Sequence, residues 1–433
     1  MNQQSEFEKL KKGELIGCRE LRLNGLGLTS FPLEILELAD TLELLDLSDN
    51  QLSQIPDEIA KFNKLKIAFF SANKFETFPP ILFQCTELEM IGFKSNELKS
   101  IAENSFPIKL RWLILTQNQL INIPKSIGNC NRLQKLMLAG NQLSSLPEEL
   151  KFCTNLELLR ISANNFSELP VWLWTLPRLA WLAYGGNLCN SSSLVQEIPA
   201  FDWNNFTMLN KLGEGASGVI SKAKDNNLGV EVAIKVFKGG VTSDGFPESE
   251  MQAFIQADKH PNLVEVLGKI TNHPQSKEGL VMKLLPIEYH ILGGSPTFQT
   301  CTRDVFDAKT SYNGKQILTI VKQMAETCLH LHQKGIMHGD FYAHNILIDN
   351  DLHTILSDFG AATQYLFPDI KHEQIEVRAW ACLLEDLLSM KNISSSEDQK
   401  IIDELEILTR KCMSLFVDQR PTFVELVERL ELI

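Results

Sequence analysis

The sequence predicts two domains of different class: an α/β solenoid built from short repeats, followed by an α+β domain. Three observations support this division. The chain has 433 residues, which is too long for one ordinary hydrophobic core. A pattern of 23 residues, once 22, recurs through the first 190 residues. After Asn187 this period stops, and the strand and helix patterns that follow have a different rhythm.

The composition excludes several classes of function. The formal net charge is -13 and the pI is about 5.3, so the chain lacks the basic field that attracts phosphate backbones, and we expect no nucleic-acid partner. The first residues contain no apolar core of signal-peptide length, and no later apolar run is long enough to span a membrane. We therefore expect no membrane span and a cytoplasmic location. The nine cysteines form no CxxC pair, which argues against a disulfide framework and a zinc ribbon.

Seven aligned copies and one degenerate copy make up the periodic region. The copies begin at residues 42, 65, 88, 110, 133, 156 and 179, as in LELLDLSDNQL, and the degenerate copy CRELRLNGLGL begins at Cys18. This is the form of a leucine-rich repeat, in which each unit gives a short strand with inward leucines and an asparagine that ties down the turning backbone. We expect an N-terminal cap over residues 1–17, the solenoid over 18–194 and a linker over 195–205. The asparagine ladder would consist of Asn50, Asn73, Asn96, Asn118, Asn141, Asn164 and Asn187.

The residues between the inward leucines should line the open concave face of the solenoid. In the central copies, the third and fifth positions are apolar where solvated residues are expected, and contiguous apolar patches mark partner sites. We predict that this patch binds a protein partner; the alternative is that the second half of the chain covers it. The patch consists of Ile67, Phe69, Met90, Trp112, Ile114, Met137 and Leu158.

A glycine-rich stretch opens the second half. LGEGASGVISKA begins at Leu212 and is followed by a turn at DNNLG and by EVAIKVF. The β-branched and apolar residues on both sides of the turn predict a hairpin, whereas a dinucleotide-binding fold would place a helix after the glycines. Glycines at such a tip let backbone amides approach phosphates. Lys235 stands in an apolar strand, where an unpaired charge would be costly, so we expect it to have a charged partner.

This set of motifs resembles the eukaryotic-type protein kinases, and the order of motifs follows that family from residue 206 to about 430. We therefore assign a two-lobed protein-kinase-like fold to residues 206–433. The resemblance implies that Lys235 holds the phosphates of ATP and pairs with Glu250, with Glu248 as the rival partner. It also implies a loop that covers these phosphates, formed by Gly213, Gly215 and Gly218.

Two further stretches carry the resemblance. LVMKLLP resembles the last strand of the small lobe and the hinge, which implies that Met282 is the gatekeeper and that Leu284 is among the residues offering backbone groups to adenine. HGDFYAHNILIDNDLHTILSDFG resembles the catalytic loop and the metal-binding motif. By this resemblance, Asp340 accepts the proton of the substrate hydroxyl, while Asn345 and Asp358 hold Mg²⁺. The implied cofactors are ATP and Mg²⁺.

The sequence departs from the family in its activation segment. Gly339 stands where the family has an arginine that clamps a phosphorylated activation loop, and we interpret it as a lost regulatory input. Only AATQYLFPDIKHEQI lies between Gly360 and a helix in which Glu376 replaces the usual aspartate. No APE motif is present, so we expect Arg420, which pairs with the APE glutamate in the family, to pair with Asp369.

Three functions remain open. The first is an ATP-dependent protein kinase, of serine/threonine type, targeted by its repeats; the second is a nucleotide-binding pseudokinase or scaffold; the third is a small-molecule phosphotransferase. The first function is favoured over the second by the intact residues Lys235, Asp340, Asn345 and Asp358. The third is favoured by the shortened activation segment, because in the family this segment forms the platform on which a peptide substrate lies. Tyr342 stands where a lysine would indicate serine/threonine specificity. As a whole, the chain resembles the soluble leucine-rich-repeat protein kinases of bacteria and protists.

Overall fold

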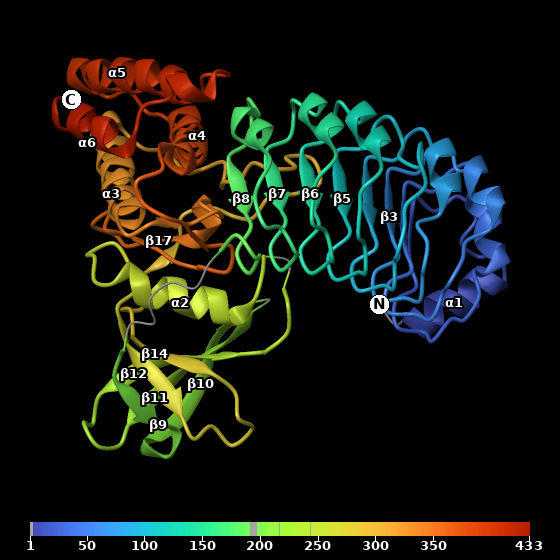
Figure 1. The fold of residues 1–433 in the computed structure, drawn as a ribbon, viewed down its shortest axis with the longest axis horizontal. Helices are drawn as coiled ribbons and strands as arrows, with labels where there is room; N and C mark the ends of the chain where they lie inside the picture. The colour runs from blue at the N-terminus through green and yellow to red at the C-terminus, as the bar shows by residue number, and fades with distance from the viewer. Residues whose placement is uncertain (1–2, 191–196, 216, 243) are drawn as a thin grey trace. The chain divides into compact units, whose positions relative to one another are not determined.

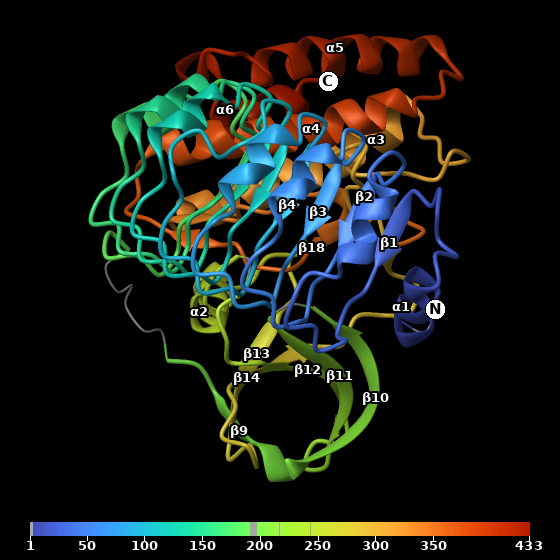
Figure 2. The ribbon, with the colours of Figure 1, turned by 90° about the vertical axis from the view of Figure 1, so that its right-hand side faces the viewer.

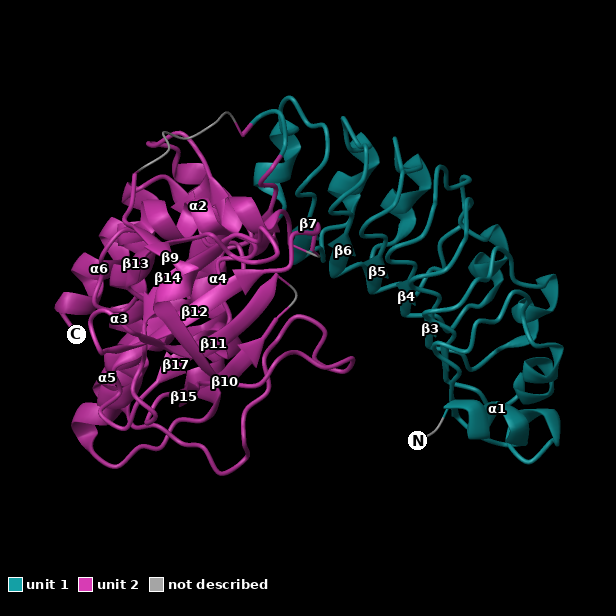
Figure 3. Cartoon of the chain, turned by 90° about the horizontal axis from the view of Figure 1, so that it is seen from below, with its two compact units in different colours: residues 1–176, 187–189 teal, residues 177–186, 190–433 magenta. Residues whose placement is uncertain are grey.

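The computed structural model describes residues 3–190, 197–215, 217–242 and 244–433. The chain forms two compact units (Figure 3). Unit 1 contains residues 1–176 and 187–189, and unit 2 contains residues 177–186 and 190–433. Within the described residues, no helix combines the length and the apolar character that crossing a membrane requires.

Unit 1 is built on short parallel strands, one from each repeat (Figure 1). Each strand pairs with the equivalent residues one repeat later, as Leu44 does with Ile67. The middle residue of every strand points into the core and is fully buried, which is the inward leucine position of the repeat. A parallel sheet of this kind fits a repeat solenoid. The strands are β1 (Glu20–Arg22), β2 (Leu44–Asp46), β3 (Ile67–Phe69), β4 (Met90–Gly92), β5 (Trp112–Ile114), β6 (Lys135–Met137) and β7 (Leu158–Arg160).

The asparagine ladder is present in unit 1, as the repeat pattern predicts. Asn73 is typical: its amide oxygen accepts from the backbone of Leu52 at 2.8 Å, and its amide nitrogen donates to the backbone oxygen of Leu47 at 3.0 Å. The last member, Asn187, bonds Phe166 and Ile161 in the same way. All seven asparagines are buried, so these bonds satisfy backbone groups that the turns would otherwise leave unpaired.

Single 3₁₀ turns connect most of the strands, and one α-helix precedes them. Cysteines follow three of these turns, and burial raises the pKa of Cys130 and Cys153 to about 12. These thiols therefore act as small apolar side chains. The elements are α1 (Gln3–Lys11), η1 (Leu33–Leu38), η2 (Asp57–Lys61), η3 (Pro80–Gln84), η4 (Lys125–Asn129), η5 (Glu148–Phe152) and η6 (Val171–Thr175).

Unit 2 contains a curled six-stranded sheet in the order β10-β11-β12-β14-β13-β9 (Figure 2). The hairpin predicted at DNNLG joins β11 to β12. The short strand β9 lies inside the segment expected to be a linker and pairs in parallel with β13. The strand of the last repeat, β8, also belongs to this unit. The elements are β8 (Trp181–Ala183), β9 (Ala200–Asp202), η7 (Trp203–Asn205), β10 (Phe206–Glu214), β11 (Gly218–Asp225), β12 (Glu231–Phe237), α2 (Pro247–Ala257), β13 (Val266–Thr271) and β14 (Gly279–Lys283).

The rest of unit 2 is mainly helical. The indole nitrogen of Trp380 on α4 donates to the backbone oxygen of Val321 on α3 at 3.0 Å, which joins two long buried helices. A small hairpin of β17 and β18 follows the stretch HGDFYAHN. The elements are β15 (His290–Ile291), α3 (Gly314–Gln333), β16 (Ile336–Met337), η8 (Ala343–Asn345), β17 (Ile346–Ile348), β18 (Thr354–Leu356), β19 (Thr363–Gln364), α4 (Ile370–Ser389), α5 (Ser396–Cys412), η9 (Val417–Gln419) and α6 (Phe423–Glu431).

Candidate active site

A buried ion pair joins the sheet of unit 2 to helix α2. The ammonium group of Lys235 on β12 contacts the carboxylate of Glu250, and both side chains are almost completely buried. Burial raises the pKa of Glu250, the nearby charge of Lys235 opposes this rise, and the charge of Asp358 adds to it. The rival residue, Glu248, is exposed on the same helix. Lys235 therefore has the charged partner that its apolar strand requires.

The three glycines before Lys235 lie where β10 turns into β11. A Cβ atom on Gly218 would lie 2.7 Å from the backbone oxygen of Val236 and 3.3 Å from Cε of Lys235, so a larger residue would push on the lysine. At Gly213 and Gly215 a Cβ atom would meet open space. The turn therefore leaves room for a ligand to approach the backbone beside Lys235.

Met282 and Leu284 stand at the end of the same sheet. Met282 on β14 is buried and lies opposite Ala233 of β12. Leu284 is half-buried and follows the last residue of β14. Both residues lie at the end of β14, where the chain leaves the sheet, and their roles as gatekeeper and hinge residue stay predictions.

Asp340 and Asn345 are joined within one loop. The amide nitrogen of Asn345 donates to Oδ2 of Asp340 at 2.7 Å and to its backbone oxygen at 2.9 Å. The backbone oxygen of Asn345 accepts from the hydroxyl of Ser357 at 2.8 Å, which places the residue before Asp358 against the loop. Because its nitrogen faces Asp340, the amide of Asn345 can offer its oxygen to a metal ion.

Asp358 and Phe359 sit between the loop and helix α2. Asp358 has a left-handed φ of 56°, and its Oδ1 accepts from the backbone of Gly360 at 3.1 Å. Phe359 is fully buried, with its ring 4.3 Å from that of Phe254 on α2 and 5.1 Å from that of His338. Phe359 thus packs the helix that carries Glu250 against the loop that carries Asp340.

Glu376 on α4 binds the backbone of the loop that carries Asp340. Its two carboxylate oxygens accept from the backbone nitrogens of Gly339 at 2.7 Å and His338 at 3.1 Å, and the ring of His332 lies 2.9 Å away. Burial alone would raise the pKa of Glu376, but the hydrogen bond and charge of His332, with smaller contributions from the loop, lower it below its usual value. Glu376 on α4 therefore stays ionised and fixes the backbone on one side of Asp340.

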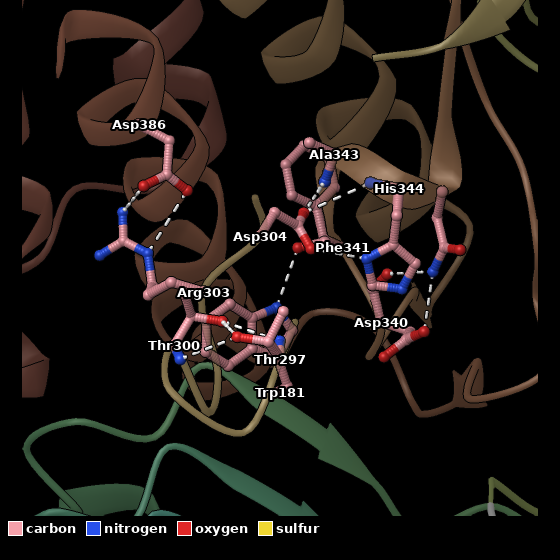
Figure 4. Close-up of polar contacts among 11 residues, drawn as sticks. Trp181, Thr297, Thr300, Arg303, Asp304, Asp340, Phe341, Ala343, His344 and Asp386 are labelled. Carbon is pink, nitrogen blue, oxygen red and sulfur yellow. Dashed lines mark hydrogen bonds and ion pairs between the residues drawn. The ribbon is translucent and has the colours of Figure 1, made fainter. Parts of the chain in front are cut away.

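Sequence reasoning missed a second support, Asp304. Its carboxylate accepts from the backbone of Ala343 at 2.5 Å and contacts Nδ1 of His344 at 2.7 Å (Figure 4). The neighbouring Arg303 contacts Glu385 and Asp386 on α4, both at 2.5 Å. Burial lowers the pKa of His344, but Asp304, followed by Asp340 and Asp358, raises it overall. No motif marks Asp304, because its partners lie about 40 positions away in the chain.

The expected pairing of Arg420 with Asp369 is wrong. The guanidinium of Arg420 donates to the backbone oxygens of Gln374, Pro177 and Ser414 at 2.8–3.0 Å. Asp369 instead accepts from the backbone of Lys371 and begins helix α4. A helix start attracts a carboxylate strongly, which removes Asp369 as a partner. Burial, and secondly a nearby arginine, lower the pKa of Arg420 to about 9.

The predicted partner patch lies on the repeat strands. The ammonium of Lys135 sits 4.1 Å from the centre of the Trp112 ring, and the indole nitrogen of Trp112 lies 3.5 Å from the sulfur of Met137. The ring of Phe69 leans over Gly92, where a Cβ atom would come within 2.6 Å of it. Met90 and Leu158 are buried, and the other members are half-buried. Aromatic and sulfur-containing side chains thus pack together on outward-facing positions of this strand row.

Two known families match parts of this chain. The family described as "Protein kinase domain" matches residues 206–373, and "Leucine Rich Repeat" matches residues 41–62. The first match covers the ion pair, the glycines and the loop of Asp340 described above.

Several curated proteins are similar to this chain over its second half. Cyclin-dependent kinase G-2 of Oryza sativa subsp. indica is 28% identical over 196 residues, which is 45% of this chain and 26% of that protein. Cyclin-dependent kinase 12 of Caenorhabditis elegans is 24% identical over 251 residues, covering 51% and 33% respectively. Cyclin-dependent kinase 11B of Homo sapiens is 26% identical over 230 residues, covering 50% and 27%. The chain therefore spans about a quarter to a third of the length of these relatives.

Proposed function

We propose that this chain, which contains a protein kinase domain and a leucine-rich repeat, is an ATP-dependent protein serine/threonine kinase. One observation carries the proposal. The ammonium of Lys235 contacts Glu250, and Asp358 lies near this pair: a Cβ atom on Gly360 would lie 3.2 Å from Oδ1 of Asp358 and 4.0 Å from Oε2 of Glu250. A phosphate-binding lysine and a metal-binding carboxylate must meet in this way for phosphoryl transfer.

The residues present fit a magnesium nucleotide. Asn345 and Asp358 offer amide and carboxylate oxygens, which are the hard donors that Mg²⁺ prefers. The open space at Gly213 and Gly215 lets phosphates approach the backbone near Lys235. Bound Mg²⁺ would neutralise part of the negative charge on the transferred phosphoryl group.

Each side chain then has a task that its contacts support. Lys235 holds phosphate oxygens, and Glu250 keeps its ammonium in place. Asn345 orients the carboxylate of Asp340 through the 2.7 Å hydrogen bond, so that Asp340 can accept the proton of the acceptor hydroxyl. Glu376 and Asp304 hold the loop backbone on either side of Asp340.

The choice of serine/threonine over tyrosine rests on relatives. The Drosophila melanogaster protein named serine/threonine-protein kinase PITSLRE is 27% identical over 177 residues of this chain, or 18% of its own length. Tyr342 occupies the position where a lysine would add support from the sequence itself. Phosphoamino-acid analysis of the product tests the choice directly: phosphotyrosine alone would overturn it.

The repeat patch is proposed to bind the protein partner that targets the kinase. Trp112, packed between Lys135 and Met137, is its largest apolar member and should anchor the contact. Trp112→Asp should weaken capture of a partner from cell extract by about thirtyfold, since loss of a buried aromatic anchor often costs about 2 kcal/mol. Phe152→Asp, at an exposed aromatic on η5, is the matched control and should leave capture unchanged.

Phosphoryl transfer to a small molecule is the second candidate. The observation that favours it is the short path from Gly360 to helix α4, which begins at Ile370. A peptide normally lies on the longer segment found at this place in protein kinases. Transfer to small acceptors but to no protein or peptide would favour this candidate.

The test of the proposal is transfer of the labelled γ-phosphate of ATP by the full chain in the presence of Mg²⁺. The proposal expects incorporation into the chain itself or into a generic protein acceptor. Asp340→Asn should reduce the rate by a hundredfold or more, because it removes the proton acceptor. Equal incorporation by both proteins would remove Asp340 from the mechanism, and binding of nucleotide without any transfer would leave a pseudokinase.

A further inference from the structure

The strand of the last repeat contacts the loop that carries Asp340. Trp181 on β8 is almost fully buried, and its indole nitrogen donates to the backbone oxygen of Phe341 at 2.9 Å (Figure 4). Its ring stacks on Tyr342, with centroids 4.3 Å apart and planes at 6°. Trp181 thus holds both residues that follow Asp340, one through the backbone and one through the side chain.

The same strand explains why residue 339 is a glycine. Gly339 has a φ of 71°, which favours glycine. A Cβ atom there would lie 2.6 Å from the backbone oxygen of Leu182 on β8 and 2.7 Å from that of Ala361. No side chain fits at such distances. The arginine that the kinase family carries at this position is therefore excluded by the backbone of β8, which passes where that side chain would begin.

Tyr184, which directly follows β8, is linked to the loop through a second series of side-chain contacts. Its hydroxyl lies 2.6 Å from Nε2 of His372, and its backbone nitrogen donates to the hydroxyl of Thr363 at 3.2 Å. The ring of His372 stacks on Tyr365 with centroids 3.9 Å apart, and the Tyr365 hydroxyl lies 2.7 Å from Nδ1 of His332. His332 contacts Glu376, which accepts from the backbone of Gly339. A continuous series, in which only Tyr365 is half-buried and the other side chains are buried, therefore connects Tyr184 to the residue before Asp340.

Neighbouring residues fasten the strand at other points of unit 2. Asn190 donates to the backbone oxygen of Gln364 at 3.2 Å. Arg378 on α4 donates to the backbone oxygen of Arg178 at 3.1 Å, and Arg420 to that of Pro177 at 2.8 Å. Pro177, Arg178 and Asn190 thus bond to the segment after Asp358, to helix α4 and to the chain beyond it.

We propose that Trp181 and Tyr184 are positioning residues for the transfer reaction, and that the last repeat replaces the activation segment as the support of the catalytic loop. The proposal rests on the proposed kinase function. Its physical basis is that the segment between Gly360 and α4 is short and reaches the loop mainly through its pairing with β16, while β8 adds a stacked ring, backbone contacts and a polar series at the same place. Strand β8, although it has the sequence of a repeat, is then part of the catalytic unit.

The proposal is tested with variants that remove the contacts of Trp181 and of Tyr184 separately. Trp181→Leu removes the stacking on Tyr342 and the hydrogen bond to Phe341, whereas Trp181→Phe keeps a ring for stacking. Tyr184→Phe removes only the contact of its hydroxyl with His372. Trp172→Leu is the matched control, because Trp172 is a half-buried tryptophan on η6 of unit 1. All are made in the full chain.

Two readouts are taken for each variant: kcat with KM for ATP, and hydrogen exchange of the amides of residues 339–345. Trp181→Leu should lower kcat at least tenfold, leave KM for ATP within twofold, and speed exchange in the loop about tenfold, because a displaced catalytic group loses rate without losing nucleotide contacts. Trp181→Phe should have a higher kcat and slower loop exchange than Trp181→Leu, without reaching the values of the unaltered chain. Tyr184→Phe should lower kcat by a few fold. Trp172→Leu should match the unaltered chain.

The proposal is overturned if Trp181→Leu folds and keeps kcat and loop exchange within twofold of the unaltered chain. It is equally overturned if kcat and ATP affinity fall together in step with a general loss of stability. Should Trp181→Leu fail to fold, Trp181→Phe and Tyr184→Phe decide by the same readouts. If the unaltered chain transfers no phosphate, the kinase function fails, but loop exchange in the variants still decides whether β8 holds the loop.

Discussion

The loop around Asp340 and the segment after Asp358 are supported differently. Side chains from α4 and from the segment before α3 hold the backbone of the loop: Glu376 on one side and Asp304 on the other. The segment after Asp358 is short. It bonds to Tyr184 and Asn190 from the last repeat, and its strand β19 also pairs with β16. The residues of the loop match the kinase motifs, while part of the support around the loop comes from β8.

This comparison changes the meaning of Gly339. Read from the sequence, the missing arginine indicates only a lost regulatory input. In the structure, the backbone oxygens of Leu182 and Ala361 fill the space where any side chain would begin. Glycine is therefore required at this position by packing, and its presence does not mark a damaged site.

The largest effect is expected from a substitution of Lys235, a residue that matches the kinase motifs. Lys235→Ala should reduce phosphate transfer by a hundredfold or more, because it removes the phosphate contact and leaves Glu250 buried without its partner. Glu248→Ala, at an exposed position of the same helix, is the control and should transfer phosphate normally. Transfer by Lys235→Ala at more than a tenth of the normal rate would contradict the assignment.

Placing at position 339 the arginine that the kinase family carries there should destabilise the protein. Gly339→Arg places a side chain against two backbone oxygens at a left-handed φ, so we expect a loss of at least about 2 kcal/mol in the free energy of unfolding and a kcat reduced tenfold or more. Denaturant unfolding and steady-state kinetics measure the two effects. A stable and equally active Gly339→Arg protein would mean that β8 does not occupy this space.

A smaller effect is expected at the carboxylate beneath the loop. Glu376→Gln should lower kcat by about tenfold, since a neutral amide offers one acceptor oxygen in place of two to Gly339 and His338. The lowered pKa of Glu376 means that its ionised form stabilises the fold above the unfolded pKa, and that this contribution is lost as pH falls through the folded value. The stability difference between the two proteins should therefore shrink in acid. A constant difference across that pH range would argue against an ionised Glu376.

Much of this arrangement follows from short sequence patterns. The asparagine ladder, the hairpin that carries Lys235 and the contact of Asp340 with Asn345 all depend on residues close in the chain or on a fixed repeat. The contacts of Asp304 with Ala343 and of Trp181 with Phe341 span 39 and 160 positions, and no local pattern marks them. Trp181 occupies a repeat position predicted to line an open face, yet tertiary packing buries it. The pairing of Arg420 failed for a related reason, because Asp369 is used at the start of a helix.

The most direct test of the central claim is the kcat of the full chain after complete dephosphorylation, confirmed by intact mass. If the last repeat holds the catalytic loop, activity needs no phosphorylated activation segment, and the first turnovers of the dephosphorylated chain should proceed at the same rate as before treatment. A rate that falls tenfold or more on dephosphorylation, and recovers on preincubation with ATP and Mg²⁺, would contradict the account, because it would show that phosphorylation rather than β8 orders the site.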